Sequence, residues 1–63
     1  MDARKTKSRA AIVTAFSELL REEDYGKITV GDIIARANVG RATFYGLFKS
    51  KDDLLAELVS DIC

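Results

Sequence analysis

The sequence contains no histidine, no proline and only one cysteine, Cys63, among its 63 residues. Without histidine or a second cysteine, it cannot form a zinc finger, a Ser-His-Asp triad or a Cys-His pair. It also lacks a nucleophile–base pair and a phosphate-cradling glycine loop, since Gly40 and Gly46 do not make one. We therefore expect no metal site, no cofactor and no enzymatic activity.

Long apolar runs are absent as well. No stretch approaches the roughly 20 apolar residues that a membrane-spanning helix requires. The basic N-terminal region followed by Ala10 to Phe16 superficially resembles a signal peptide, but Thr14 and Glu18 interrupt the apolar pattern too early. A lone cysteine fits a reducing compartment. The sequence thus predicts a soluble, cytoplasmic protein with no membrane partner.

The net charge is zero, but the charges fall in separate blocks along the chain. Residues 1–9 carry four bases and one acid, whereas residues 18–24 carry four acids and one base. Residues 36–51 then carry four bases and no acid, and residues 52–61 carry four acids and no base. Because the blocks are separated, a total of zero does not exclude a polyanionic partner.

Apolar residues recur at helical spacing through most of the chain, which predicts an all-α fold. The first helix is expected over about residues 8–23, with Gly26 as its end. A second helix should start after Thr29, whose side chain can form a capping box with Asp32. It should stop at Asn38, because asparagine readily adopts the left-handed conformation that ends a helix.

Two further helices are expected after this turn. The third, over about residues 41–47, is short and places Phe44 and Phe48 on its core side. The fourth begins with a second pair at capping-box spacing, Ser50 and Asp53, and its apolar stripe runs to the chain end. We therefore expect the natural protein to continue beyond this chain.

These elements make one domain over residues 1–63: an all-α, homeodomain-like three-helix bundle of the helix-turn-helix kind, plus the start of a fourth helix. The second helix of such a motif enters a major groove. Residues 1–7 are expected to form a flexible basic arm, which is either simply solvated or follows the DNA backbone or minor groove.

The outer face of the third helix is nearly bare at its centre. Since Phe44 faces the core, Ala42 and Gly46 lie in the middle of the opposite face, with Thr43 and Tyr45 beside them. A slim helix can approach base edges closely. This acid-free segment therefore favours double-stranded DNA as the partner.

Individual side chains suggest different contacts with DNA. Arg41 is the best candidate for guanine, while the Ala42 methyl can touch a thymine methyl and Thr43 can hydrogen-bond either way. Lys51, at the start of the fourth helix, and the Tyr45 hydroxyl suit phosphates. Plainer interpretations remain open: Arg41 and Lys51 as solvated charges, and Tyr45 as a packed ring with a wet hydroxyl.

An ordered set of short motifs, together with the apolar pattern of a first helix from Ile12 to Leu20, spans nearly the whole chain. The set comprises Thr29-Val30 with Asp32-Ile33, Ala37-x-Val39, Thr43-Phe44-Tyr45 with Phe48, and Ser50-Lys51 before Leu54-Leu55. In this order the motifs resemble the DNA-binding domain of the TetR (tetracycline repressor) family of bacterial transcriptional regulators. The fold expected from the helical pattern agrees with that resemblance.

The resemblance implies two groups of DNA contacts. The phosphate contacts are Thr29, Tyr45 and Lys51. The residues at or near the bases are Arg41, Ala42 and Thr43. We add Gly40 and Lys49, which flank the third helix, to the candidate DNA-binding set.

The resemblance also implies partners beyond this chain. Members of the family carry a larger helical domain that binds a small-molecule effector and dimerises, and this domain is absent here. A homodimer reading a palindromic operator, as a repressor released by its ligand, is therefore expected. Three residues depart from the family pattern: Asn38 replaces the usual turn glycine, Gly46 lacks a polar or aromatic side chain, and Leu47 replaces a histidine or tyrosine that binds phosphate. The last two predict a lower affinity.

A second class of function fits part of the pattern. The apolar face of the fourth helix could dock a protein partner, with the charge blocks setting specificity, in a helical interaction module that does not bind DNA. Such a module gives no reason for an acid-free segment around a helical turn. A gel shift with genomic DNA fragments tests for DNA binding, and a pull-down of protein partners tests for the interaction module.

Overall fold

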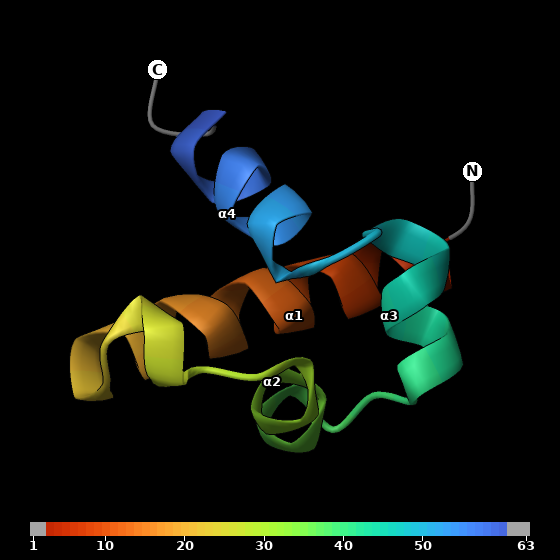
Figure 1. Cartoon of the computed structure of the whole chain (residues 1–63). Coiled ribbons are helices and arrows are strands. Elements are labelled where there is room, and N and C mark those ends of the chain that lie inside the picture. The colour runs from red at the N-terminus through yellow and green to blue at the C-terminus, as the bar shows by residue number, and fades with distance from the viewer. Residues whose placement is uncertain (1–2, 61–63) are drawn as a thin grey trace.

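The structure is a computed structural model that describes residues 3–60. Within that range it contains four α-helices, one short 3-10 helix and no strand: α1 (Ala3–Glu22), η1 (Tyr25–Lys27), α2 (Val30–Ala37), α3 (Arg41–Leu47) and α4 (Lys51–Ser60). Helix α4 rises on the opposite side of α1 from α2, and α3 lies near the N-terminal end of α1 (Figure 1). The predicted all-α class is confirmed. No helix in this range is long and apolar enough to cross a membrane.

One cluster of apolar side chains forms the core, and every α-helix contributes to it. Its buried members are Ile12, Phe16, Leu19, Ile28, Ile33, Phe44, Phe48 and Leu54. The spacing of the first three is the i, i+4, i+7 stripe expected for the first helix. Because burying one such side chain contributes about 1.5–3 kcal/mol, a domain this small depends on each of them.

The first helix differs from the expectation chiefly at its start, since its end lies within one residue of the expected position. It begins at Ala3, so residues 3–7 of the expected basic arm are helical, and residues 1–2 lie outside the described residues. Alanine, arginine and lysine have high helix propensity, which explains the earlier start. The helix ends at Glu22, and Gly26 lies within η1 without a positive φ angle. Gly26 was therefore wrongly predicted to end α1.

The ends of α2 match the prediction. The Asp32 N–H donates to the Thr29 hydroxyl at 3.1 Å, and the Thr29 N–H donates to the Asp32 carboxylate, also at 3.1 Å. This reciprocal capping box fixes where the helix starts. At the other end Asn38 adopts the left-handed conformation, with φ 59° and ψ 45°. Both ends of α2 are thus set by local sequence.

The start of α4 follows the prediction only in part. The Ser50 hydroxyl accepts a hydrogen bond from the Asp53 N–H at 3.3 Å, as a cap should. The Asp53 carboxylate, however, accepts from the Lys49 N–H at 3.3 Å, one residue before the position that a capping box requires. The helix is described to Ser60, and the expected continuation through residues 61–63 lies outside the described residues.

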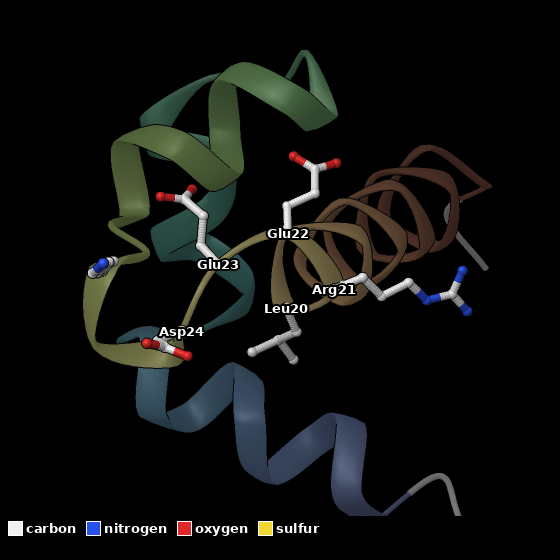
Figure 2. Close-up of a pocket in the computed structure, with 6 residues that line it drawn as sticks. Leu20, Arg21, Glu22, Glu23 and Asp24 are labelled. Carbon is white, nitrogen blue, oxygen red and sulfur yellow. The ribbon is translucent and has the colours of Figure 1, made fainter.

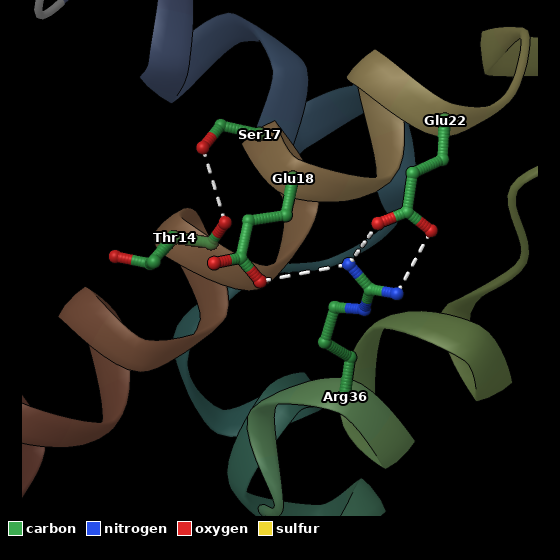
Figure 3. Close-up of polar contacts among 5 residues, drawn as sticks. All are labelled: Thr14, Ser17, Glu18, Glu22 and Arg36. Carbon is green, nitrogen blue, oxygen red and sulfur yellow. Dashed lines mark hydrogen bonds and ion pairs between the residues drawn. The ribbon is translucent and has the colours of Figure 1, made fainter.

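A charged clamp joins α1 to α2 (Figure 3). The Arg36 guanidinium donates to both oxygens of the Glu22 carboxylate, at 2.5 and 2.8 Å, and lies 3.6 Å from Glu18. The hydrogen bonds with Glu22, and to a smaller extent the charges of both glutamates, raise the pKa of Arg36 above its usual value. The two-pronged geometry suits an arginine–carboxylate pair. Arg36 is therefore occupied within the fold.

Candidate nucleic-acid interface

The turn between α2 and α3 is short and tightly bonded. The backbone N–H groups of Asn38 and Val39 both donate to the carbonyl of Ile34, the latter at 3.1 Å. Asn38 reverses the chain without a glycine because asparagine tolerates the left-handed region better than most residues. Val39 packs against the core cluster, so the turn is held by packing as well as by hydrogen bonds.

The inner face of α3 fixes the rotation of the helix about its axis. Phe44 is fully buried, Phe48 is 3% exposed, and their ring centroids lie 5.7 Å apart. With these two rings in the core, the outer face consists of the residues on the opposite side of the helix. Its exposed residues are Arg41, Ala42, Thr43, Tyr45 and Gly46.

The middle of this outer face carries no large side chain, as expected. Gly46 has no atom within 4 Å of the position that a side-chain Cβ would occupy, so open space lies above it. Gly40 is the N-cap residue immediately before α3, with a φ of −79° and no side-chain cap hydrogen bond, and its Cβ position would lie 4.0 Å from the Thr43 hydroxyl oxygen. Neither glycine is required by backbone conformation. Their effect is to keep the surface of α3 thin.

Tyr45 combines the two interpretations that the sequence left open. Its ring stands edge-on to Phe44, with centroids 5.3 Å apart and an interplanar angle of 86°. The side chain is nevertheless 49% exposed. The packed ring thus holds the side chain in place at the exposed rim of α3, where a hydroxyl suits a phosphate.

Thr29 lies at the exposed start of α2, and its hydroxyl can both accept and donate a hydrogen bond. Its hydroxyl oxygen accepts a hydrogen bond from the Asp32 N–H, and the hydroxyl proton remains free to donate elsewhere. The terminal Nη2 of Arg41 lies 3.9 Å from the Cβ position of Gly31, so the Arg41 side chain reaches toward this same helix start. Thr29 and Arg41 therefore lie on one side of the motif.

Two of the four bases in the basic segment, residues 36–51, make contacts within the fold. Of its four bases, Arg36 is clamped to Glu22, and the Lys51 ammonium donates to the backbone carbonyls of Tyr25 and Ile28. Arg41 and Lys49 are exposed, and within residues 6–60 neither makes an ion pair. Sequence reasoning missed the engagement of Lys51 because its partners lie 23 and 26 residues away.

A shallow hollow of about 290 Å³ lies on a different surface, around the end of α1 (Figure 2). It is lined by Leu20, Arg21, Glu22, Glu23, Asp24 and Lys27. Figure 2 shows the Arg21 side chain pointing away from the carboxylates of Glu22 and Glu23. Its lining carries three acids and two bases, so it offers a polyanion no net attraction. Among the described residues, no group of histidine, cysteine, aspartate and glutamate could hold a metal ion.

The geometry defines a class of protein: a helix-turn-helix domain whose second helix is anchored by aromatic residues and presents a slim, acid-free face. The model of the family described as "Bacterial regulatory proteins, tetR family" matches residues 12–58. This chain belongs to that family. The expectation drawn from the ordered motifs is confirmed. The family consists of transcriptional regulators, which bind DNA and are not enzymes.

Solved and curated relatives agree with this assignment. The crystal structure of a TetR transcriptional regulator from Streptococcus agalactiae superposes with a TM-score of 0.91 at 52% identity, over 97% of this chain and 35% of that one. The uncharacterized HTH-type transcriptional regulator YxbF of Bacillus subtilis is 38% identical over all of this chain and 17% of its own length. The HTH-type dhaKLM operon transcriptional activator DhaS of Lactococcus lactis is 36% identical over 79% of this chain and 31% of its own length. The chain therefore spans about a third or less of each of these relatives.

Proposed function

We propose that this chain is the operator-reading module of a bacterial transcriptional regulator and binds double-stranded DNA sequence-specifically through α3. One observation carries the proposal: Phe44 and Phe48 lock α3 against the core, so that its slim outer face points away from the protein. A helix held in this way can enter a major groove without unfolding any part of the domain.

The proposed contacts divide into those that read bases and those that hold the backbone. Base edges are read by Arg41, Ala42 and Thr43. Phosphates are bound by Thr29, Tyr45 and Lys49, with the thin backbone at Gly40 allowing close approach. Lys51 is proposed as a further phosphate contact through its charge and its remaining ammonium proton, since its two partners within the fold are neutral carbonyls.

The whole regulator is proposed to act as a homodimer on a palindromic operator in the cytoplasm. One module reads one half-site, so two modules should stand about 34–36 Å apart, one turn of the duplex. Dimerisation and effector binding are assigned to the part of the protein beyond this domain. We propose that effector binding releases a repressor. DhaS, a relative of this chain, is named an activator.

Two substitutions test the division of contacts. Arg41→Ala should relax base preference, since a good bidentate base contact is worth about 1–3 kcal/mol of discrimination. Lys49→Ala should weaken binding to all sequences alike, because a phosphate contact carries no sequence information. The measurement is selection of duplexes from a randomised pool, followed by anisotropy titration of selected and random duplexes. Equal losses on both duplexes for both variants would contradict the proposal.

A helical protein-interaction module is the second candidate, and one observation favours it. Val59 on α4 is a large apolar side chain that is 56% exposed. The exposed Val59 side chain is compatible with a docking surface on α4, but a docking function would give no role to the outer face of α3. Pull-down with the chain as bait, run beside gel shifts with genomic fragments, separates the candidates. Capture of protein without any DNA shift would favour the interaction module.

A further inference from the structure

We propose that Tyr25 is a positioning residue for the phosphate contact of Lys51. In the free protein it holds the Lys51 ammonium in place without neutralising its charge. The inference rests on the proposed function, in which Lys51 binds a phosphate. Tyr25 itself is not assigned a contact with DNA, so its effect on binding is exerted through Lys51.

The partners of the Lys51 ammonium within the fold are neutral, and two of the three belong to Tyr25. The ammonium donates to the carbonyl of Ile28 at 2.9 Å and to the carbonyl of Tyr25 at 3.0 Å. It also lies 4.2 Å from the centroid of the Tyr25 ring, a distance typical of a cation–π contact. Within residues 6–60, Lys51 makes no ion pair. Its positive charge and one ammonium proton therefore remain for an anion.

The Tyr25 ring is itself held from two sides. It packs edge-on against Phe16 of α1, with centroids 6.1 Å apart and an interplanar angle of 73°. Since Phe16 is fully buried, this contact anchors the ring on the core cluster. The hydroxyl at the tip of the ring donates to the carboxylate of Asp52. Lys51 is thus supported by a ring that cannot easily turn away.

The hydrogen bond to Asp52 also occupies the acid next to Lys51. Asp52 lies in the first turn of α4, where its negative charge could pair with the Lys51 ammonium in place of a phosphate. Its carboxylate instead accepts from the Tyr25 hydroxyl. This hydrogen bond, together with partial burial and the charge of the carboxylate, raises the pKa of Tyr25 to about 12. The hydroxyl therefore remains a donor at neutral pH and keeps Asp52 engaged.

The physical advantage of this arrangement is preorganisation. A mobile lysine side chain loses rotamer freedom when it is held against a phosphate, and that loss weakens binding. Lys51 is half-buried and already held in the free protein, whereas no group among residues 6–60 holds the exposed Lys49 ammonium. The cation–π contact with the Tyr25 ring should correspond to about a two- to fivefold effect on DNA binding.

The first test is a double-mutant cycle on binding to a random-sequence duplex, measured over a range of salt concentrations. Lys51→Met should lower the slope of log K against log salt by about one unit, because one phosphate contact is lost. Tyr25→Leu should weaken binding by about two- to fivefold when Lys51 is present and should have no further effect in Lys51→Met. The matched control is Leu58→Ala, which weakens the packing of α4 about two turns away from Lys51. Its effect should be the same with and without Lys51.

The outcomes separate failure of this inference from failure of the proposed function. Equal losses for Tyr25→Leu with and without Lys51, beside a lowered slope in Lys51→Met, would overturn the role of Tyr25 and leave the phosphate contact in place. An unchanged slope in Lys51→Met would refute that phosphate contact, and the inference with it. Absence of duplex binding by the unmodified chain would refute the proposed function as a whole.

The second test measures the position of the ammonium without DNA. The ring current of Tyr25 should shift the ε-methylene protons of Lys51 upfield of those of Lys49 in the NMR spectrum of the free chain. Tyr25→Phe keeps the ring and should keep the shift, whereas Tyr25→Leu should abolish it while circular dichroism shows retained helix. Coincident signals of Lys51 and Lys49 in the unmodified chain would overturn the inference.

Discussion

Tyr25 illustrates how a single residue can acquire a role that its sequence context does not suggest. In the sequence it stands between an acidic run and a glycine, in a segment with no helical periodicity. In the fold its ring contacts Phe16 and its hydroxyl donates to Asp52. Both partners belong to other elements, so only the assembled structure brings these groups together.

The hydrogen bond from Tyr25 to Asp52 leads to a prediction about the pKa of the Tyr25 hydroxyl. The pKa of Tyr25 is raised from the usual 10.0 to about 12, so the folded state holds this proton more tightly than the unfolded state. The stability that results is fully present below pH 10 and is lost as the pH rises from there through about 12. Asp52→Ala should return the pKa of Tyr25 toward 10, since it removes both the acceptor and its charge.

The measurement is an ultraviolet titration of tyrosinate in a Tyr45→Phe background, which leaves Tyr25 as the single tyrosine. Far-ultraviolet circular dichroism recorded at each pH identifies the range in which the domain is still folded. An identical titration midpoint with and without Asp52 would show that the hydrogen bond is absent in solution.

At the scale of elements, the parts of the fold set by neighbouring residues were predictable from the sequence. The α2 capping box needs only Thr29 and Asp32, and the left-handed stop needs only Asn38, so both were identified correctly. The core side of α3 was also predictable, because helical periodicity alone places Phe44 and Phe48 together. Local signals therefore located the motif and the candidate DNA-binding face.

Features that depend on distant partners could not be predicted in this way. The clamp of Arg36 on Glu22 and the engagement of Lys51 require knowing how α1, η1 and α4 lie against one another. The start of α1 was also missed, since a run of bases was interpreted as an arm although its residues favour helix. Counting charges along the sequence thus did not reveal that Arg36 is paired within the fold.

The turn between α2 and α3 provides a test at this scale. Asn38 has a φ of 59°, where a side chain other than that of asparagine, aspartate or glycine is strained. Asn38→Ala should lower the free energy of unfolding by about 1–2 kcal/mol, whereas Asn38→Gly should be tolerated. Urea denaturation of both variants measures the difference. Equal stability of the alanine and glycine variants would contradict the left-handed turn.

For the whole molecule, the positions of the charged residues matter more for DNA binding than the net charge does. The chain has ten bases and ten acids, but the exposed outer face of α3 carries no acid, whereas three acids and two bases line the hollow near the end of α1. A polyanion should therefore favour the α3 face over the hollow. A neutral total is compatible with DNA binding because the two surfaces are separate.

One module should give weak binding, and pairing two modules should strengthen it. Two copies of the chain joined by a flexible linker should bind a duplex with two inverted half-sites more tightly than one copy does, by about 100-fold or more through effective concentration. The gain should be largest at a half-site spacing of about 10–10.5 base pairs. Anisotropy titration over a series of spacings measures it. A gain that is independent of spacing would contradict the docking geometry.

The most direct test of the account is an NMR titration of the 15N-labelled chain with a duplex at low salt. The account predicts that amide shifts move along residues 40–46 and near Thr29 and Lys49, while the acidic hollow of residues 20–24 stays unchanged. Unmoved shifts along α3, or changes centred on the hollow, would contradict the claim that the outer face of α3 reads DNA.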